Sequence, residues 1–168
     1  MLYDFLRRLT VMVVLCLAQA LVLNRIQLFH CATPLLYAYF AIIFPRSYPK
    51  WAILIWAFLL GLLIDTFSNT PGLAAASLTL IAAIQPYIFE LFVPRDSAEN
   101  LKPALSTLGP TKYSYYIILL VLLYCLVFYS LELFNFFNWQ QWAMCIGGSA
   151  VITLVLIYTF EIAKAKRG

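Results

Sequence analysis

Long apolar runs separated by short polar gaps constrain the fold of this chain more than any other feature of its sequence. A membrane-spanning helix needs about 20 mostly apolar residues, because the hydrocarbon core of a bilayer is roughly 30 Å thick. The chain has 168 residues, of which 64% are hydrophobic and 11% charged, whereas a soluble domain is about a quarter charged. The sequence therefore predicts an all-α, polytopic membrane protein, a single six-helix transmembrane domain over residues 1–168. The expected spans are 5–24, 28–44, 50–66, 71–93, 113–135 and 142–163.

The basic residues predict how these spans are oriented. Every Lys and Arg except Arg25 falls in the N-terminal segment, in alternate gaps, or in the C-terminal segment. Cytoplasmic loops carry an excess of Lys and Arg, so this distribution predicts that both termini are cytoplasmic. The same residues form no cluster suited to nucleic acid. We therefore expect the protein to lie in the lipid bilayer and to bind no nucleic acid.

The N-terminal run has two interpretations. Arg7 and Arg8 precede apolar residues and the sequence Ala18-Gln19-Ala20, as in a secretory signal peptide with its cleavage site. The apolar run continues to Leu23, however, whereas the hydrophobic region of a signal peptide is normally about 7–15 residues long. We therefore expect an uncleaved first helix.

Chemistry-bearing residues are few. The cysteines lie in or beside apolar runs without C-x-x-C spacing, and His30 is the only histidine. We expect the cysteines to be small apolar side chains at helix interfaces. A metal centre or a catalytic set would need more ligands, or a nucleophile beside a base, so we expect no metal, no cofactor and no enzymatic activity. The cysteines are Cys16, Cys31, Cys125 and Cys145.

Two of the expected spans, 28–44 and 50–66, are short. At 1.5 Å per residue, the apolar run from Trp51 to Ile64 covers roughly 21 Å of a core about 30 Å thick. We therefore expect Asp65, which follows it, to lie at membrane depth. Irregular backbone at that depth must be buried in protein or line a wet cavity. The sequence thus predicts a polar outer pocket around residues 24–30 and 65–72.

Asp65 is the first candidate for a function, because an intramembrane carboxylate is a functional-site hypothesis by default. One interpretation pairs Asp65 with Arg25, the only base expected on the outer side. A second has Asp65 accept backbone N–H bonds at the turn before the fourth span, and a third leaves it solvated by a thinned bilayer. In that turn we expect Thr70 to cap the fourth helix, with Pro71 at its first position.

Other acidic, small and aromatic residues have structural interpretations. Glu90, Glu132 and Glu161 fall near span ends, where we expect solvent or lipid headgroups around them. The aromatic residues of the fifth span are a hypothetical partner surface, because interfaces are rich in aromatic residues. Contact with lipid and packing inside the protein are the alternatives. These aromatic residues are Tyr116, Tyr124, Phe128 and Tyr129, and the small residues expected to allow close helix approach are Ala57, Gly61, 74–77 and 147–149.

Residues 61–73 resemble the motif of a known family. Gly-Leu-Leu-Ile-Asp ends at Asp65, a short polar turn through Asn69 follows, and Pro71-Gly72 precedes an Ala-rich run. This pattern is similar to that of the MreD rod shape-determining family, in which Gly-Leu-Leu-x-Asp precedes a polar turn and Pro-Leu-Gly or a similar sequence. The structural or partner-binding candidates are Asp65, Arg25, Pro71, Gly72, Asn69 and Gly61.

The resemblance extends more weakly over the rest of the chain. Gln19 and Pro34 fall where the family often has Gln and Pro. Leu35 departs from the family, many members of which have an acidic residue after that proline. The resemblance implies a six-helix bundle resembling the substrate-binding (S-component-like) subunits of energy-coupling-factor vitamin transporters.

The resemblance also implies a function. Its members are non-enzymatic scaffold or regulatory subunits of the bacterial cell-elongation (rod) complex in the cytoplasmic membrane, where they support cell shape and lateral peptidoglycan synthesis. The implied partner is an MreC-like protein. Actin-like MreB filaments, a SEDS glycosyltransferase and a penicillin-binding transpeptidase belong to the same assembly.

Two other classes of protein remain as alternatives. A vitamin-binding S-component would explain a polar outer pocket, but such subunits often carry Ala-x-x-x-Ala in the first helix, and Ala18 and Ala20 have the wrong spacing. A small membrane enzyme acting on lipid would need clustered acidic or metal-binding residues at an interface. Asp96 and Glu99, the acidic residues of one inner gap, look solvated.

Overall fold

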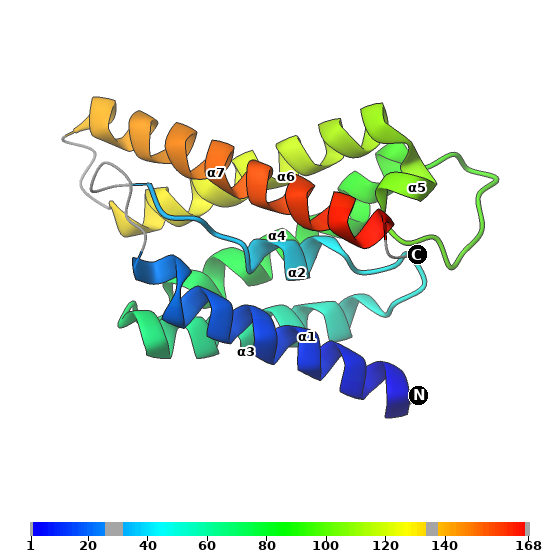
Figure 1. The fold of residues 1–168 in the computed structure, drawn as a ribbon, viewed down its shortest axis with the longest axis horizontal. Coiled ribbons are helices and arrows are strands. Elements are labelled where there is room, and N and C mark those ends of the chain that lie inside the picture. The colour runs from blue at the N-terminus through cyan, green and yellow to red at the C-terminus, as the bar shows by residue number, and fades with distance from the viewer. Residues whose placement is uncertain (1, 26–31, 134–137, 167–168) are drawn as a thin grey trace.

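A computed structural model describes residues 2–25, 32–133 and 138–166 of the chain. The elements in these ranges are all helices, packed as an antiparallel bundle (Figure 1). They are α1 (Leu2–Leu21), the 3₁₀ helix η1 (Leu23–Arg25), α2 (Ala38–Ile42), α3 (Lys50–Ser68), α4 (Leu73–Phe92), α5 (Leu105–Leu108), α6 (Pro110–Glu132) and α7 (Trp139–Ala165).

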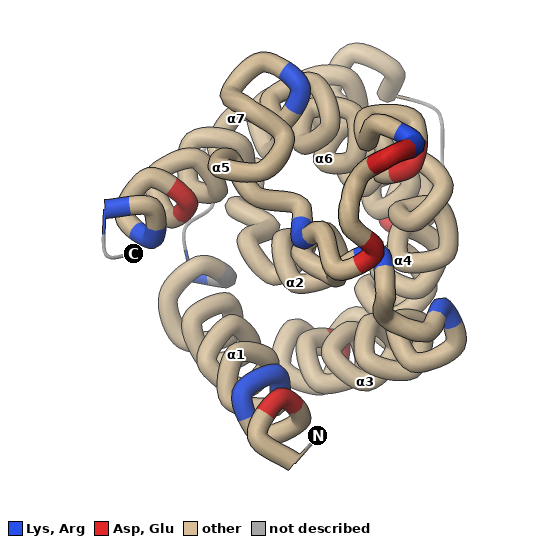
Figure 2. The backbone as a smooth tube through the Cα atoms, turned by 90° about the vertical axis from the view of Figure 1, so that its right-hand side faces the viewer, with Lys and Arg blue, Asp and Glu red and all other residues tan. Residues whose placement is uncertain are grey.

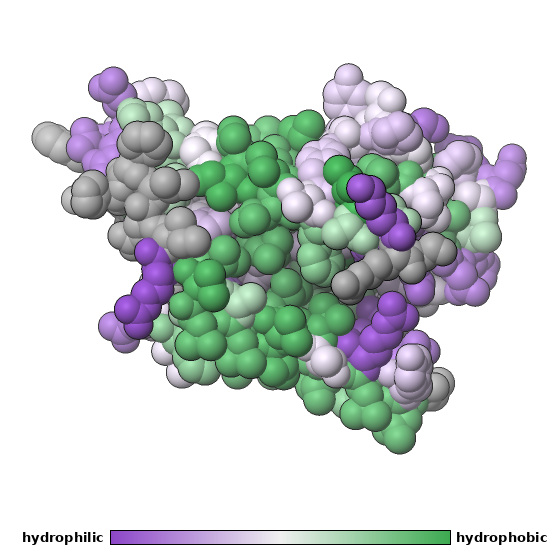
Figure 3. Space-filling view, viewed as in Figure 1, coloured by the Kyte–Doolittle hydropathy of each residue, from purple (hydrophilic) through white to green (hydrophobic). Residues whose placement is uncertain are grey.

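Four of the described helices, α3, α4, α6 and α7, are long and apolar enough to cross a membrane. Their lengths of 19 to 27 residues correspond to about 28–40 Å at 1.5 Å per residue, enough for a hydrocarbon core of about 30 Å. Figure 3 shows apolar surface across the middle of the molecule and hydrophilic surface toward both ends. Large apolar side chains of these helices are exposed, such as Leu126 on α6 and Val151 on α7. This is the surface of a polytopic helical membrane protein.

The prediction of six span-length helices is not met in the described residues. α1 has 20 residues, but its first half carries Asp4, Arg7 and Arg8, so the apolar part alone is shorter than a span. The second expected span, 28–44, is not a continuous helix. Its residues 28–31 lie outside the described ranges, residues 32–37 are not helical, and α2 has only 5 residues.

The two ends of the bundle differ in charge. Both termini and the connections 43–49 and 93–104 lie at one end, here called the terminal end, and the α3–α4 turn lies at the opposite, distal end (Figure 1). Figure 2 looks at the terminal end, where Lys and Arg gather on the termini and the connections. Among the described residues, Arg25 is the one base that belongs to a distal segment.

Residues 32–44, here called the central segment, run through the interior from the distal to the terminal end (Figure 1). Helical geometry is disfavoured directly before Pro34, because the proline ring clashes with the backbone of the preceding residue. Ala38 and Ala41 are fully buried, and Tyr37 and Phe40 are 1% exposed. The segment that the sequence predicted as part of a second spanning helix is therefore buried, irregular backbone that leads into one short helix.

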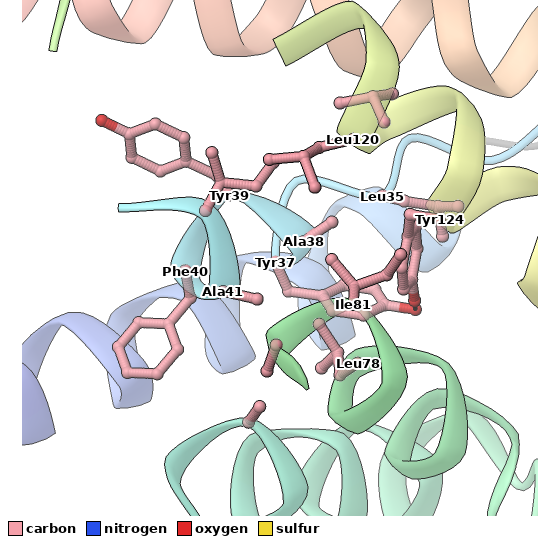
Figure 4. Close-up of a cluster of buried hydrophobic side chains, with 14 of the residues drawn as sticks. Leu35, Tyr37, Ala38, Tyr39, Phe40, Ala41, Leu78, Ile81, Leu120 and Tyr124 are labelled. Atoms are coloured by element: carbon pink, nitrogen blue, oxygen red, sulfur yellow. Dashed lines mark hydrogen bonds between the residues drawn. The ribbon is translucent and has the colours of Figure 1, made fainter. Parts of the chain in front are cut away.

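The centre of the core is built on this segment (Figure 4). Tyr124 of α6 donates a hydrogen bond to the hydroxyl oxygen of Tyr37 at 2.6 Å, and the two rings meet edge to face at 5.9 Å between centroids. Leu78 and Ile81 of α4 are fully buried against it. Edge-to-face rings and buried aliphatic side chains give the core both area and a defined geometry.

The aromatic face of α6 belongs to this core. Tyr116 and Tyr124 are fully buried, Tyr129 is 3% exposed and Phe128 is 8% exposed. The hypothesis that these residues form a partner surface is therefore wrong, and packing inside the protein is correct.

The third expected span is longer than its apolar run suggested. α3 continues through Asp65 to Ser68 and has 19 residues, whereas the apolar run stops at Ile64 and the expected span was 50–66. Polar side chains in this last part of α3 have hydrogen-bond partners. Thr66, for example, donates its hydroxyl hydrogen to the Leu62 carbonyl at 2.8 Å.

Candidate functional site: the α3–α4 joint and the distal cavity

The Asp65 carboxylate caps the N-terminus of α4. The first N–H groups of a helix have no partner within the helix, and here two of them point at Asp65. Ala74 N donates to one carboxylate oxygen at 2.8 Å, and Ala75 N donates to the other at 2.9 Å. The Thr70 hydroxyl donates to the first oxygen at 3.0 Å. Asp65 is 5% exposed, so these bonds replace its hydration and place negative charge where the helix dipole favours it.

This geometry selects one of the interpretations left open by the sequence. Both oxygens of Asp65 are engaged by the α4 N-terminus and its turn, as the turn-capping interpretation expects. No ion pair joins Asp65 to Arg25 in the part of the chain that the structure describes, and Arg25 is exposed on η1. Asp65 is buried in the protein, and its partners are two backbone N–H groups and the Thr70 hydroxyl.

Gly61 allows α3 and α4 to touch. A Cβ built on Gly61 would lie 2.3 Å from the Cα of Ala75 and 2.6 Å from its nitrogen, a separation that no side chain can occupy. Gly61 and Asp65 are one turn apart on α3, so the same face of that helix provides both the close approach and the cap. The small-residue seam expected on α3 and α4 is confirmed at this contact.

Two residues with positive φ shape the turn between these helices. Asn69 ends α3 with φ +56°, in the left-handed conformation that Asn tolerates after a helix. Gly72 has φ +81° directly before α4, where only glycine is free of strain. Together with Gly61 and Asp65 they define a tight helical hairpin.

The expected start of the fourth helix is wrong in detail. α4 begins at Leu73, and Gly72 is its N-cap residue, so Thr70 does not cap it and Pro71 does not occupy its first position. Thr70 instead bonds to Asp65, and Pro71 is exposed in the turn. The prediction failed because Asp65, from the preceding helix, provides the cap that a local side chain would otherwise supply.

A cavity of about 390 Å³ opens beside this joint at the distal end. Arg25, Phe67, Ser68 and Thr70 line it, as the expected pocket around 24–30 and 65–72 requires, while residues 26–30, with Gln27 and His30, lie outside the described ranges. The remaining described lining residues come from α1, the central segment, α3, α4 and α6: Ala20, Thr33, Leu35, Tyr37, Ile64, Ala74, Phe128 and Glu132.

The floor of the cavity is the non-helical part of the central segment, whose backbone is bonded to side chains of the surrounding helices. Ser149 accepts from the Thr33 N–H at 3.1 Å, and Thr153 accepts from the Leu35 N–H at 3.0 Å. Gln19 of α1 donates to the Pro34 carbonyl at 2.8 Å. Irregular backbone at membrane depth is tolerated only when it is buried in protein or lines a wet cavity, and this segment meets that condition through bonds across the bundle.

The other end of the central segment is bonded in the same way. Gln85 of α4 donates to the Ile42 carbonyl at 3.3 Å, and the Tyr116 hydroxyl donates to the same carbonyl at 3.2 Å. Gln85 also donates to the Tyr116 hydroxyl at 2.9 Å. These bonds give the Ile42 carbonyl, which lies at the end of α2, the partners that a helix of 5 residues cannot provide by itself.

Sequence reasoning missed the polar face of α7. Ser149, Thr153 and Glu161 are all buried on it. The signal was present, because the positions fall four or eight residues apart and share one face of a helix.

Glu161 was expected in solvent or at headgroups. It is 3% exposed and accepts from the Tyr39 hydroxyl at 2.5 Å, so that expectation is wrong. Glu90 and Glu132 are exposed, which is consistent with the expectation of solvent or lipid headgroups around them.

The cysteines divide into two kinds. Cys16 and Cys125 are buried and free, which agrees with the expectation of small apolar side chains. Cys145, near the distal end of α7, is disulfide-bonded, which corrects that expectation for this residue. Cys31 lies outside the described residues. No group of three or more His, Cys, Asp or Glu side chains that could hold a metal ion occurs within the described ranges.

Comparisons of the chain with family models, with curated proteins and with solved structures find no match. The interpretation of the joint and the cavity therefore depends on their own geometry.

Proposed function

We propose that this protein is a non-enzymatic scaffold or regulatory subunit of a bacterial cell-elongation complex, held in the cytoplasmic membrane and bound to an MreC-like protein. The observation that carries the proposal is the α3–α4 joint. The residues that resemble the MreD motif, Gly61, Asp65, Asn69 and Gly72, act together in one hairpin. A motif whose residues share one structural task is stronger support than residues scattered over the fold.

Two further positions of the resemblance also meet in space. Gln19 and Pro34 are joined by a hydrogen bond of 2.8 Å between the Gln19 side chain and the Pro34 carbonyl. The departure at Leu35 is explained locally, since this side chain is 2% exposed and an acidic residue there would need a partner in the core. The polar residues around the central segment stabilise its shape, as a binding scaffold requires.

The proposal includes the finer architecture, a six-pass bundle like the S-component subunits with both termini cytoplasmic. α1 and the central segment supply the crossings that are not span-length apolar helices. The concentration of Lys and Arg at the terminal end supports this orientation. So does the disulfide of Cys145 at the distal end, because disulfides persist on the oxidising side of a membrane.

The test is affinity purification of the full chain from native membranes in several mild detergents, followed by mass spectrometry. An unrelated polytopic membrane protein with the same tag and expression level is the control. Specific recovery of an MreC-like protein or a peptidoglycan synthase is the expected result. Absence of both from every detergent, with the tagged chain still monodisperse, contradicts the proposal.

The distal cavity favours a second candidate, a vitamin-binding subunit of an energy-coupling-factor transporter. Its volume of about 390 Å³ lies in the range of small-molecule sites, about 300–1,000 Å³. Mass spectrometry of the protein purified from cells distinguishes the two. A vitamin bound in stoichiometric amount, with a transporter ATPase recovered in place of the MreC-like protein, would reverse our ranking.

A further inference from the structure

The distal cavity carries opposite charges that do not neutralise each other. Arg25 enters it from η1, after the end of α1, and Glu132 enters it from the last residue of α6. No ion pair involves either residue in the ranges that the structure describes, and both are exposed. Here each charge is available to a molecule between them.

The rest of the cavity adds an apolar wall and a buried hydrogen-bond donor. Phe67 and Phe128 line it together with aliphatic side chains. Tyr37, 1% exposed, also lines it and accepts a hydrogen bond from Tyr124, so its own hydroxyl hydrogen remains to be donated. Tyr37 donates to no acceptor among the described residues. Arg25 thus supplies donors suited to an oxyanion, and Glu132 supplies an acceptor suited to an ammonium group.

We propose that the distal cavity binds a small zwitterion that carries a primary ammonium group and an oxyanion. The oxyanion bonds to Arg25, and the ammonium group bonds to the Glu132 carboxylate. A primary ammonium fits because a carboxylate accepts N–H hydrogen bonds, which a quaternary ammonium cannot donate. The inference concerns ligand chemistry and holds whether the protein is a scaffold or a transporter subunit.

This chemistry has two sources. One is a free small molecule that enters from the distal side. The other is the headgroup of a lipid such as phosphatidylethanolamine, which has the same ammonium and phosphate groups. The apolar wall of the cavity is compatible with either, and the experiment separates them.

The free-ligand experiment measures binding to the full chain, purified in detergent and depleted of lipid. The probes are phosphoethanolamine, β-alanine, phosphocholine and inorganic phosphate. We expect phosphoethanolamine or β-alanine to bind at millimolar concentrations or below, and phosphocholine to bind at least about tenfold more weakly than phosphoethanolamine. In the lipid arm, native mass spectrometry of protein taken from vesicles with equal phosphatidylethanolamine and phosphatidylcholine should show retained phosphatidylethanolamine if the headgroup is the source.

Two variants separate the charges. Glu132→Gln should weaken phosphoethanolamine binding, or phosphatidylethanolamine retention, by about tenfold while changing inorganic phosphate binding by less than about twofold. Arg25→Gln should weaken both. Glu90→Gln and Arg95→Gln, exposed residues at the terminal end, are matched controls that should change neither.

Three outcomes would overturn the inference. They are no binding of either zwitterion together with no lipid selectivity, equal binding of phosphocholine and phosphoethanolamine, and unchanged binding in Glu132→Gln. Each is read from the purified chain, so recovery or loss of an MreC-like partner does not enter the result. Failure here and failure of the proposed function are therefore distinguishable.

Discussion

Replacing Asp65 with asparagine tests whether the carboxylate caps α4 or pairs with a base. The substitution keeps the size of the side chain and leaves one acceptor oxygen in place of two. That oxygen can still accept from Ala74 N or Ala75 N, but the other N–H, at 2.8 or 2.9 Å in the native protein, then faces an amide NH₂ group.

The magnitude follows from these contacts. A buried donor left without an acceptor costs about 1–3 kcal/mol. Removing negative charge from a helix N-terminus costs about 0.3–1 kcal/mol at an exposed site and up to about 2 kcal/mol in a partly buried one. Asp65→Asn should therefore lower the free energy of unfolding by about 2–4 kcal/mol, and Asp65→Ala should lower it further because Thr70 also loses its acceptor.

Unfolding in mixed micelles, followed by tryptophan fluorescence, measures this change, with Arg25→Gln as the companion variant. Arg25 is exposed and bonds to no carboxylate among the described residues, so Arg25→Gln alone should change stability by less than about 0.5 kcal/mol. The double variant should be additive, because the sites share no contact. A coupling of about 1 kcal/mol or more, or a loss below about 0.5 kcal/mol for Asp65→Asn, refutes the capping argument.

The remaining predictions concern packing, the central segment and the disulfide. Gly61→Ala should destabilise the protein by about 1–3 kcal/mol or more, because its Cβ would lie 2.3 Å from the Cα of Ala75. Gly147→Ala, whose Cβ would meet nothing within 4 Å, should be neutral or stabilising by up to about 1 kcal/mol. Thermal unfolding of both variants checks the contrast, and equal effects would contradict it. Gln19→Leu should cost about 1–3 kcal/mol in micelle unfolding, since it leaves the Pro34 carbonyl without this donor; no loss would mean that the bond is dispensable. Maleimide labelling of denatured protein should modify Cys16 and Cys125 without reductant and Cys145 only after reduction, and a reactive Cys145 thiol before reduction would contradict the disulfide.

The sequence was most informative where neighbouring residues decide the structure. The hairpin 61–73 was recognisable because Gly61, Asp65, Asn69 and Gly72 lie close together in the sequence and shape one helical hairpin. Even there, the apolar run ending at Ile64 underestimated α3, since helices end where their backbone bonds end and not where hydrophobicity ends.

The central segment could not be predicted in the same way. The run 28–44 has the composition of a helix. The irregular path of its residues 32–37 is stabilised by Ser149 and Thr153, which are 116 and 118 residues away from the backbone groups they bond. Such partners are chosen by tertiary packing and leave only an indirect trace, the polar face of α7. Polar residues four or eight positions apart on an otherwise apolar spanning helix indicate a buried partner in need of hydrogen bonds.

The irregular central segment makes the helices of this bundle depend on one another. In a bundle of complete helices each span satisfies its own backbone, and neighbours associate through packing alone. Here Gln19 of α1, Gln85 of α4, Tyr116 of α6 and Thr153 of α7 each complete a bond of the central segment. A shift of α1 would remove the side-chain partner of the Pro34 carbonyl, and a shift of α7 would remove that of the Leu35 N–H. The Ile42 carbonyl would lose both of its side-chain donors only if α4 and α6 moved together, so the central segment holds the distal cavity and the α3–α4 joint in fixed relation. That rigidity is what a scaffold needs to present one face to a partner, and what a zwitterion site needs to keep its charges apart.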